Sequence, residues 1–206
     1  AGSGLAAGCR DGKVWVEDVD AGVATVLEGH IGDVMALVML PDATLASGSK
    51  DSTVRLWDLA RQVCVAKLEW RSGAVQCLAV LADGRLASGS DNGVITLWNV
   101  SSHTCVGTMA GSNCQVSALA ALPDGRLVSG SEEVSSKEGR VDIHRLIQLW
   151  DTHPTSSRAG TMPMTVTYLP THANKLVSLP DGRLACVCDR TFVVYLLEVP
   201  PTVAYV

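Results

Sequence analysis

Three residues in the first third of the chain have the types found in a hydrolase triad. His30, Ser47 and Asp51 could supply a base, a nucleophile and an orienting carboxylate. The nucleophile of such enzymes often stands on a sharp turn between a strand and a helix, within Gly-x-Ser-x-Gly. Ser47 instead follows Leu45 and Ala46, in a stretch that predicts the middle of a strand. The sequence therefore favours a structural role for this set over catalysis.

The other residue patterns that could bind a cofactor are weak. Gly2, Gly4 and Gly8 do not have the spacing of a dinucleotide or Walker motif, and no lysine follows at the required place. His144, His153 and His172 lack the short spacing of a metal site. The sequence predicts no metal and no cofactor.

Cysteine usage indicates reduced thiols in an intracellular protein. The chain has seven cysteines, an odd number: Cys9, Cys64, Cys77, Cys105, Cys114, Cys186 and Cys188. Small apolar cysteines on strands are expected in a core. Cys186 and Cys188 alternate along a strand and share a face, but a metal there would need two further ligands.

The stretch LASGSKDSTVRLWD, residues 45–58, organises the chain because it recurs. LASGSDNGVITLWN begins at Leu86, LVSGSEE begins at Leu127, and IQLWD begins at Ile147. Trp57 and Trp98 lie 41 residues apart. Two short strands joined by a tight turn are predicted at 45–49 and 54–57, and further strands at 23–27 and 34–39.

This repeat, with Gly29-His30 before it and Trp57-Asp58 after it, resembles the WD40-repeat family over roughly residues 5–198. The resemblance implies an all-β propeller of four-stranded antiparallel blades. We expect about four complete blades and one that begins midway, as part of a larger propeller of about seven blades. The remaining blades would then lie outside this chain.

The resemblance also implies a buried hydrogen-bonded chain of a loop histidine, a strand serine, a turn aspartate and a tryptophan. The matching residues are His30, Ser47, Asp51 and Trp57. Later repeats retain only parts of the set: Ser88, Asn92, Trp98, Ser129 and Trp150. This structural network accounts for the serine, histidine and aspartate without catalysis.

The whole chain, residues 1–206, is expected to be one repeat region. We place the repeat units at about 5–30, 31–71, 72–112, 113–163 and 164–206. The fourth unit carries an insertion at 132–144, which we expect to be a long polar excursion, either functional or disordered. The last unit is degraded, and residues 202–206 could supply its outer strand.

Composition excludes several classes of partner. Sixteen basic and 21 acidic side chains give a net charge of −5, so direct nucleic-acid binding is disfavoured. No apolar run is long enough to span a membrane. We expect an intracellular and cytoplasmic protein, with a cytoskeletal or ciliary location and the nucleus as alternatives.

The function predicted from the resemblance is a non-catalytic scaffold that presents loops to partner proteins or assembles a protein complex. Candidate contacts, placed by the family's template, are Lys50, Trp70, Arg71, Glu132, Glu133, Lys137 and Arg140. The alternatives are a propeller-type hydrolase, or a propeller that binds a small ligand or a phosphoinositide. The inner strands bring almost no ligands for such a hydrolase, and the Phe-Arg-Arg-Gly motif of lipid-binding propellers is absent.

Overall fold

The computed structural model describes residues 4–69, 73–110, 114–137, 140–152, 164–169, 173–179, 183–188 and 194–198. These residues form eighteen β-strands, and there is no helix among them. The strands make five antiparallel sheets in chain order. The predicted all-β class and blade architecture are therefore confirmed.

The first two sheets contain three and four strands. The first is β1 (Gly4–Gly8), β2 (Val14–Asp18) and β3 (Val23–Leu27). The second is β4 (Val34–Met39), β5 (Leu45–Ser49), β6 (Thr53–Asp58) and β7 (Val63–Glu69). The predicted strands at 23–27, 34–39 and 45–49 have these bounds, and the one at 54–57 is longer by one residue at each end.

The remaining sheets repeat the pattern. The third is β8 (Val75–Val80), β9 (Leu86–Ser90), β10 (Val94–Asn99) and β11 (Thr104–Ala110). The fourth is β12 (Val116–Ala121), β13 (Leu127–Lys137), β14 (Arg140–Trp150) and β15 (Met164–Leu169). The fifth is β16 (Ala173–Ser178), β17 (Arg183–Cys188) and β18 (Val194–Glu198). The outer strand expected at 202–206 lies outside the described residues.

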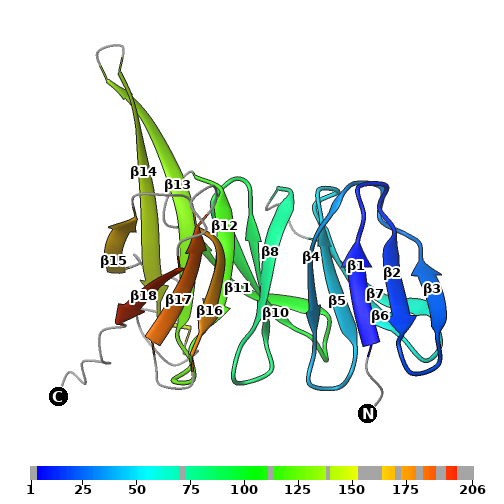
Figure 1. Ribbon diagram of the computed structural model, residues 1–206. Helices are drawn as coiled ribbons and strands as arrows, with labels where there is room; N and C mark the ends of the chain where they lie inside the picture. The colour runs from blue at the N-terminus through cyan, green and yellow to red at the C-terminus, as the bar shows by residue number, and fades with distance from the viewer. Residues whose placement is uncertain are drawn as a thin grey trace.

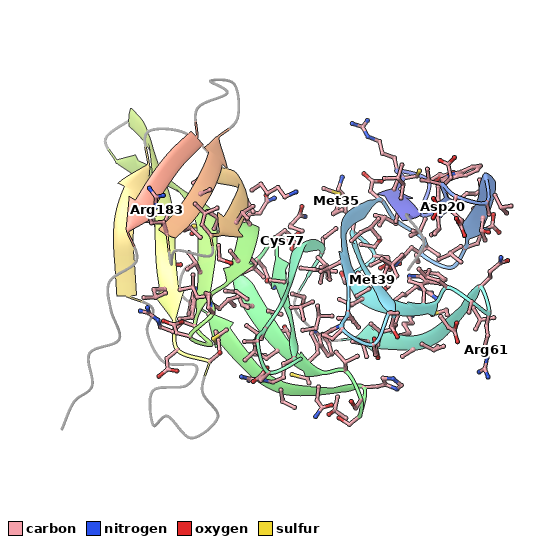
Figure 2. All side chains as sticks on the ribbon, turned by 60° about the horizontal axis from the view of Figure 1, so that its bottom comes forward. Asp20, Met35, Met39, Arg61, Cys77 and Arg183 are labelled. Carbon is pink, nitrogen blue, oxygen red and sulfur yellow. The ribbon has the colours of Figure 1, made fainter. Side chains whose placement is uncertain are left out.

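The sheets stand side by side like blades in Figure 1. Their inner strands β1, β4, β8, β12 and β16 contact one another in succession. In Figure 2 they form an open arc that the described residues do not close into a ring. Met35 and Met39 on β4 are 43% and 50% exposed.

The fourth sheet corrects two sequence-based predictions. The insertion at 132–144 is not a structureless excursion, because it lengthens β13 and β14, which pair without interruption from Leu127–Trp150 to Lys137–Arg140. The strand β15 pairs with β14, so the fourth blade reaches Leu169 and not residue 163. Extra residues between Trp150 and Met164 therefore belong to the connection within this blade, which a fixed repeat length could not reveal.

The first sheets pack closely because a glycine stands in the second strand of each of the first three repeats. A Cβ atom on Gly48 would lie 2.5 Å from Val75 Cγ1, and one on Gly89 would lie 2.6 Å from Val116 Cγ1. A Cβ atom on Gly8 would likewise lie 2.6 Å from Val34 Cγ1. Any side chain at these positions would force the neighbouring inner strand away.

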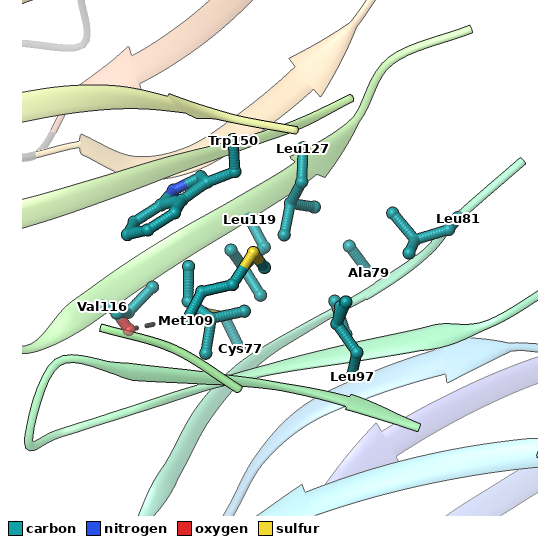
Figure 3. Packing of buried hydrophobic residues seen from close by; sticks show 11 residues of the cluster. Cys77, Ala79, Leu81, Leu97, Met109, Val116, Leu119, Leu127 and Trp150 are labelled. Atoms are coloured by element: carbon teal, nitrogen blue, oxygen red, sulfur yellow. Dashed lines mark hydrogen bonds between the residues drawn. The ribbon is translucent and has the colours of Figure 1, made fainter. Parts of the chain in front are cut away.

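The tryptophan of each four-stranded sheet packs against the sheet before it. Trp57 belongs to the cluster of Val14 and Leu27 on the first sheet. Trp98 packs with Leu56 and Leu68 on the second sheet. Trp150 reaches the cluster of Ile95, Met109 and Cys77 on the third sheet, shown in Figure 3 with the hydrogen bond from Cys77 to the Val116 carbonyl. The core is thus a series of interfaces between blades.

One arginine, Arg85, connects the third sheet by a hydrogen bond to the chain that leaves the fourth sheet. Arg85 lies in the turn between β8 and β9, and its Nε donates to Asp83 Oδ2 at 2.7 Å. Its Nη2 donates to the carbonyl of Thr152 at 2.7 Å, on the chain that leaves β14. The Arg85 side chain is only 17% exposed, so water competes weakly for these bonds.

We expect Arg85→Ala to lower the free energy of unfolding by about 1.5–3 kcal/mol, the usual contribution of a hydrogen bond to a charged group. Urea unfolding followed by tryptophan fluorescence measures the change. The matched control is Arg61→Ala, since Arg61 is 80% exposed and lies 3.7 Å from Asp58. Equal losses for both variants would show that the contact with Thr152 does not hold the blades together.

Candidate functional site

A chain of hydrogen bonds runs from Trp57 through the second sheet to the link between β3 and β4. Trp57 Nε1 donates to Ser47 Oγ at 2.7 Å. Ser47 Oγ lies 2.7 Å from His30 Nε2, and His30 Nδ1 lies 2.8 Å from Asp51 Oδ2. These partners fit a neutral imidazole that accepts from Ser47 at Nε2 and donates to Asp51 from Nδ1.

The geometry gives these residues a structural role. Ser47 is fully buried, and His30 is only 6% exposed, so a substrate cannot reach either side chain in this conformation. Ser47 Oγ is already committed to Trp57 and His30. Among the residues with described side chains, no group of three or more His, Cys, Asp or Glu could hold a metal ion.

Asp51 is held as a carboxylate. Burial alone would raise its pKa, but hydrogen bonds from Thr53, His30 and the Ile31 backbone outweigh that effect and lower the pKa to about 2. Burial lowers the pKa of His30 below its ordinary value of 6.5, against the opposing pull of Asp51. A neutral histidine beside an ionised aspartate is therefore the stable arrangement near neutral pH.

Thr53 is a member of the network that sequence reasoning missed. Its Oγ1 donates to Asp51 Oδ1 at 2.7 Å and lies 3.2 Å from His30 Nδ1. Its backbone N–H also donates to Asp51 Oδ1, at 3.0 Å. A threonine two residues after a turn aspartate is a known local hydrogen-bonding pattern, and that spacing was the available signal.

The network fixes the four residues of the link from His30 to Asp33. The Ile31 N–H donates to Asp51 Oδ2 at 3.1 Å, and Ser49 Oγ donates to the Gly32 carbonyl at 2.9 Å. The backbone N–H of Lys50 donates to the Asp33 carbonyl at 2.9 Å. Each link residue is thus tied to the end of β5 or to the turn that follows it.

Two side chains here are exposed to solvent: Ile31 on this rigid link and Lys50 on the adjoining β5–β6 turn. Ile31 is 92% exposed, the highest value among the exposed large apolar residues. Lys50 Nζ lies 2.8 Å from Asp33 Oδ2, and its hydrogen bond lowers the pKa of that carboxyl. We use the name upper rim for the β3–β4 link, the β5–β6 turn and the β13–β14 hairpin, which all lie at the top of Figure 1.

Among the described residues, the third and fourth sheets show the tryptophan–serine part of the network. Trp98 Nε1 donates to Ser88 Oγ, and Trp150 Nε1 donates to Ser129 Oγ, both at 2.8 Å. Asn92 Oδ1 accepts from Ser90 Oγ at 2.5 Å, so it organises its own turn.

The predicted partner contacts fall into three groups. Lys50 is on the upper rim beside Ile31. Trp70 and Arg71 lie outside the described residues. Glu132, Glu133, Lys137 and Arg140 occupy strand positions on β13 and β14, where the register pairs Lys137 with Arg140.

The cysteines with described side chains form no disulfide bond with one another: Cys9, Cys64, Cys77, Cys105, Cys114 and Cys186. Burial raises the pKa of Cys77 to about 12. Its thiol donates to the Val116 carbonyl at 3.4 Å, within the interface between the third and fourth sheets. Cys77 therefore acts as a small packed side chain and not as a nucleophile.

The chain matches the family model for the WD domain, G-beta repeat, at residues 22–58, 62–99 and 103–151. These segments together cover more than half of the chain. The described residues contain no helix that is long and apolar enough to cross a membrane.

Two curated relatives and one solved structure illustrate the similarity. Small ribosomal subunit protein RACK1y of Oryza sativa subsp. japonica is 44% identical over 61 residues, 29% of this chain and 18% of that protein. Protein HIRA of the same organism is 49% identical over 45 residues, 21% of this chain and 5% of that protein. The chain therefore spans less than a fifth of either relative. The crystal structure of the Doa1 WD40 propeller domain matches 95% of this chain and 61% of that chain, with a TM-score of 0.72 and 21% identity.

We expect Ser47→Ala to destabilise the chain by about 2–4 kcal/mol, because it leaves Trp57 Nε1 and His30 Nε2 buried without their partner. Ser88→Ala is the matched control, because Ser88 has the same strand position and is bound by Trp98. It should lower stability by only about 1–2 kcal/mol. Urea unfolding of both variants checks the difference, and equal losses would mean that the His30 bond contributes nothing.

Stability should fall as the solution is acidified, in two stages. The lowered pKa of His30 means that protonation favours the unfolded chain, so stability declines as the pH falls below 6.5. The lowered pKa of Asp51 adds a second decline as the pH falls from 3.8 towards about 2. The variant His30→Asn should flatten the first stage, whereas exposed His103→Asn should not. An unchanged pH profile in His30→Asn would contradict this assignment.

Proposed function

The chain belongs to the WD40-repeat family, and on that basis we propose that it is a non-catalytic interaction scaffold whose upper rim captures a partner protein. Propellers of this family generally serve as scaffolds. The observation that carries the proposal is Ile31, an isoleucine that is 92% exposed on a link whose backbone is fastened to its own blade. An exposed apolar side chain on a rigid backbone loses little entropy when it binds.

The surroundings of Ile31 favour a protein as the partner. Lys50 and Asp33 form a half-exposed ion pair next to it, so the rim offers an apolar contact bordered by both charge signs. A polar border around an apolar centre is the usual composition of a protein interface. The β13–β14 hairpin rises from the same edge of the molecule in Figure 1 and extends the surface that a partner can meet.

The relatives agree with a role inside an assembly. RACK1y is by its name a protein of the small ribosomal subunit, so a chain with similar repeats works there within a large complex. We propose the same general role here, in the cytoplasm. The absence of disulfide bonds among the six cysteines with described side chains supports a reducing compartment. Trp70 and Arg71 remain proposed contacts on the link after β7.

We also propose that further blades complete the arc beside the first sheet. Leu5 on β1 is 64% exposed, whereas its repeat counterparts Leu45, Leu86 and Leu127 are at most 2% exposed. In the later sheets an inner strand pairs with the edge that β1 leaves open. Trp15, on the neighbouring strand β2, is also 47% exposed. An additional inner strand and a preceding blade would cover these residues, as they do in the rest of the chain.

A photocrosslinking amino acid placed at Ile31 tests the partner site. Benzoylphenylalanine at position 31 should crosslink one protein reproducibly in the native complex, and mass spectrometry should identify it. The matched control is the same amino acid at Val63, which is 45% exposed on the outer strand β7. Crosslinks to the same protein from Val63 and none from position 31 would place the partner at the outer strand β7 and not on the upper rim.

Once the partner is known, Ile31→Asp should weaken its binding by about tenfold or more, as expected for a central apolar contact. The free energy of unfolding should stay unchanged, because the Ile31 side chain packs against almost nothing in the free chain. An affinity within about twofold of the wild type would contradict a central role for Ile31.

A further inference from the structure

The β13–β14 hairpin continues beyond the blade that carries it. The inner strand β12 pairs with β13 only as far as Ser131, and the outer strand β15 pairs with β14 only as far as Arg145. Past those positions the two strands continue pairing with each other up to Lys137 and Arg140. Figure 1 shows the ribbon projecting well above the other blades.

Both edges of this ribbon are open among the described residues. Among the strands that the structure describes, the backbone of residues 132–137 pairs with β14 alone, and the backbone of 140–144 pairs with β13 alone. A two-stranded ribbon is marginally stable in water, and an open edge carries N–H and C=O groups ready to pair with another strand. The charges along each edge indicate which strand could pair with it.

The charges at the two ends of residues 133–137 on β13 are complementary when the strand is paired with a reversed copy of itself. Glu133, Ser135 and Lys137 alternate with Val134 and Ser136, so these three positions share one face of the ribbon. Two identical antiparallel strands in one sheet are related by a two-fold axis perpendicular to the sheet. Such an axis places each residue opposite one that has the same alternation along the strand.

With the axis at Ser135, Glu133 of each copy stands opposite Lys137 of the other. Ser135 then pairs with its own equivalent, and Val134 pairs with Ser136. The same contact between opposite charges therefore occurs twice. If the axis passes through Val134 or Ser136 instead, neither Glu133 nor Lys137 meets an opposite charge among the described strand residues.

The other edge of the ribbon offers a shorter match. A two-fold axis at Asp142 on β14 would place two aspartates opposite each other, and like charges directly opposite one another destabilise a sheet. An axis at Val141 would place Arg140 opposite Asp142 twice, but that pairing spans only residues 140–142 of the described strand. The match on β13 spans five described residues, and this longer match favours the β13 edge.

We propose that two copies of this chain associate through the free edge of β13, in antiparallel and two-fold symmetric pairing over Glu133–Lys137. The two hairpins then form one continuous four-stranded sheet in the order β14, β13, β13, β14. The pairing begins beyond Ser131, where the edge of β13 is no longer occupied by β12. This inference does not depend on the partner proposed for Ile31.

The expected association is weak. Five paired residues bury far less than the roughly 1,600 Å² of a standard stable interface. The dimer should therefore be visible only at high protein concentration, or where an assembly holds two copies close together.

Charge reversal with sedimentation analysis tests the proposal, at protein concentrations up to about 1 mM. Glu133→Lys or Lys137→Glu alone should weaken self-association by about tenfold, because each places like charges opposite each other at both symmetric positions. Mixing the two single variants should restore association, because every pair across that interface is again opposite in charge. The double variant Glu133→Lys/Lys137→Glu should also associate as the wild type does.

Two controls separate this pairing from other effects. Glu28→Lys makes the same change in net charge at a 68% exposed position away from the hairpin, and it should leave association unchanged. Replacing residues 132–145 with Asp-Asn-Gly, the turn of the third sheet, should abolish association while the blades remain folded.

A chain that stays monomeric up to about 1 mM would overturn the proposal, as would two single variants that fail to associate when mixed. Association that survives the hairpin replacement would place the contact elsewhere. None of these results affects the crosslinking experiment at Ile31, so failure of this inference and failure of the proposed function are distinguishable.

Discussion

The close approach of one sheet to the next is the constraint on which the rest of the structure depends. A single blade cannot bury its own faces, so the core consists of interfaces between blades. Gly48 and Gly89 permit the short contacts with Val75 and Val116. This approach brings Trp57 and Trp98 against the preceding sheet, where they are almost completely buried. A larger residue at either glycine would separate the sheets and expose those tryptophans.

The polar network is possible only inside that packed frame. Four buried groups satisfy one another between Trp57 and Asp51, and water is excluded from them. This buried network also fixes part of the surface. The link is anchored residue by residue, so the exposed side chain of Ile31 stands on a fixed backbone. A catalytic set would need the reverse arrangement, with the hydroxyl of Ser47 open to a substrate.

The sequence predicted the strands that follow the repeat pattern and missed the structural features that depart from it. The strands at 23–27, 34–39 and 45–49 follow from alternation and turn residues, which are local properties. The hairpin was missed because its alternating residues are mostly polar, and polarity suggested a long excursion, either functional or disordered, in place of two longer strands. The strand at 164–169 was assigned to the wrong blade because the extra residues before it shift the repeat. The exposure of Ile31 depends on how its link is bonded to residues about 20 positions later, which no local pattern reveals.

The network consists of two parts with different structural duties. The tryptophan–serine bond joins strands within a sheet and is present in the second, third and fourth sheets. The His30–Asp51 part instead joins a link to a turn, and it needs a histidine in the link and an aspartate in the turn. The fourth sheet carries a long hairpin at this turn, yet Trp150 still bonds to Ser129. The upper rim can therefore change in length and chemistry while the blade beneath it keeps its packing, and this separation makes the fold suited to presenting different surfaces to different partners.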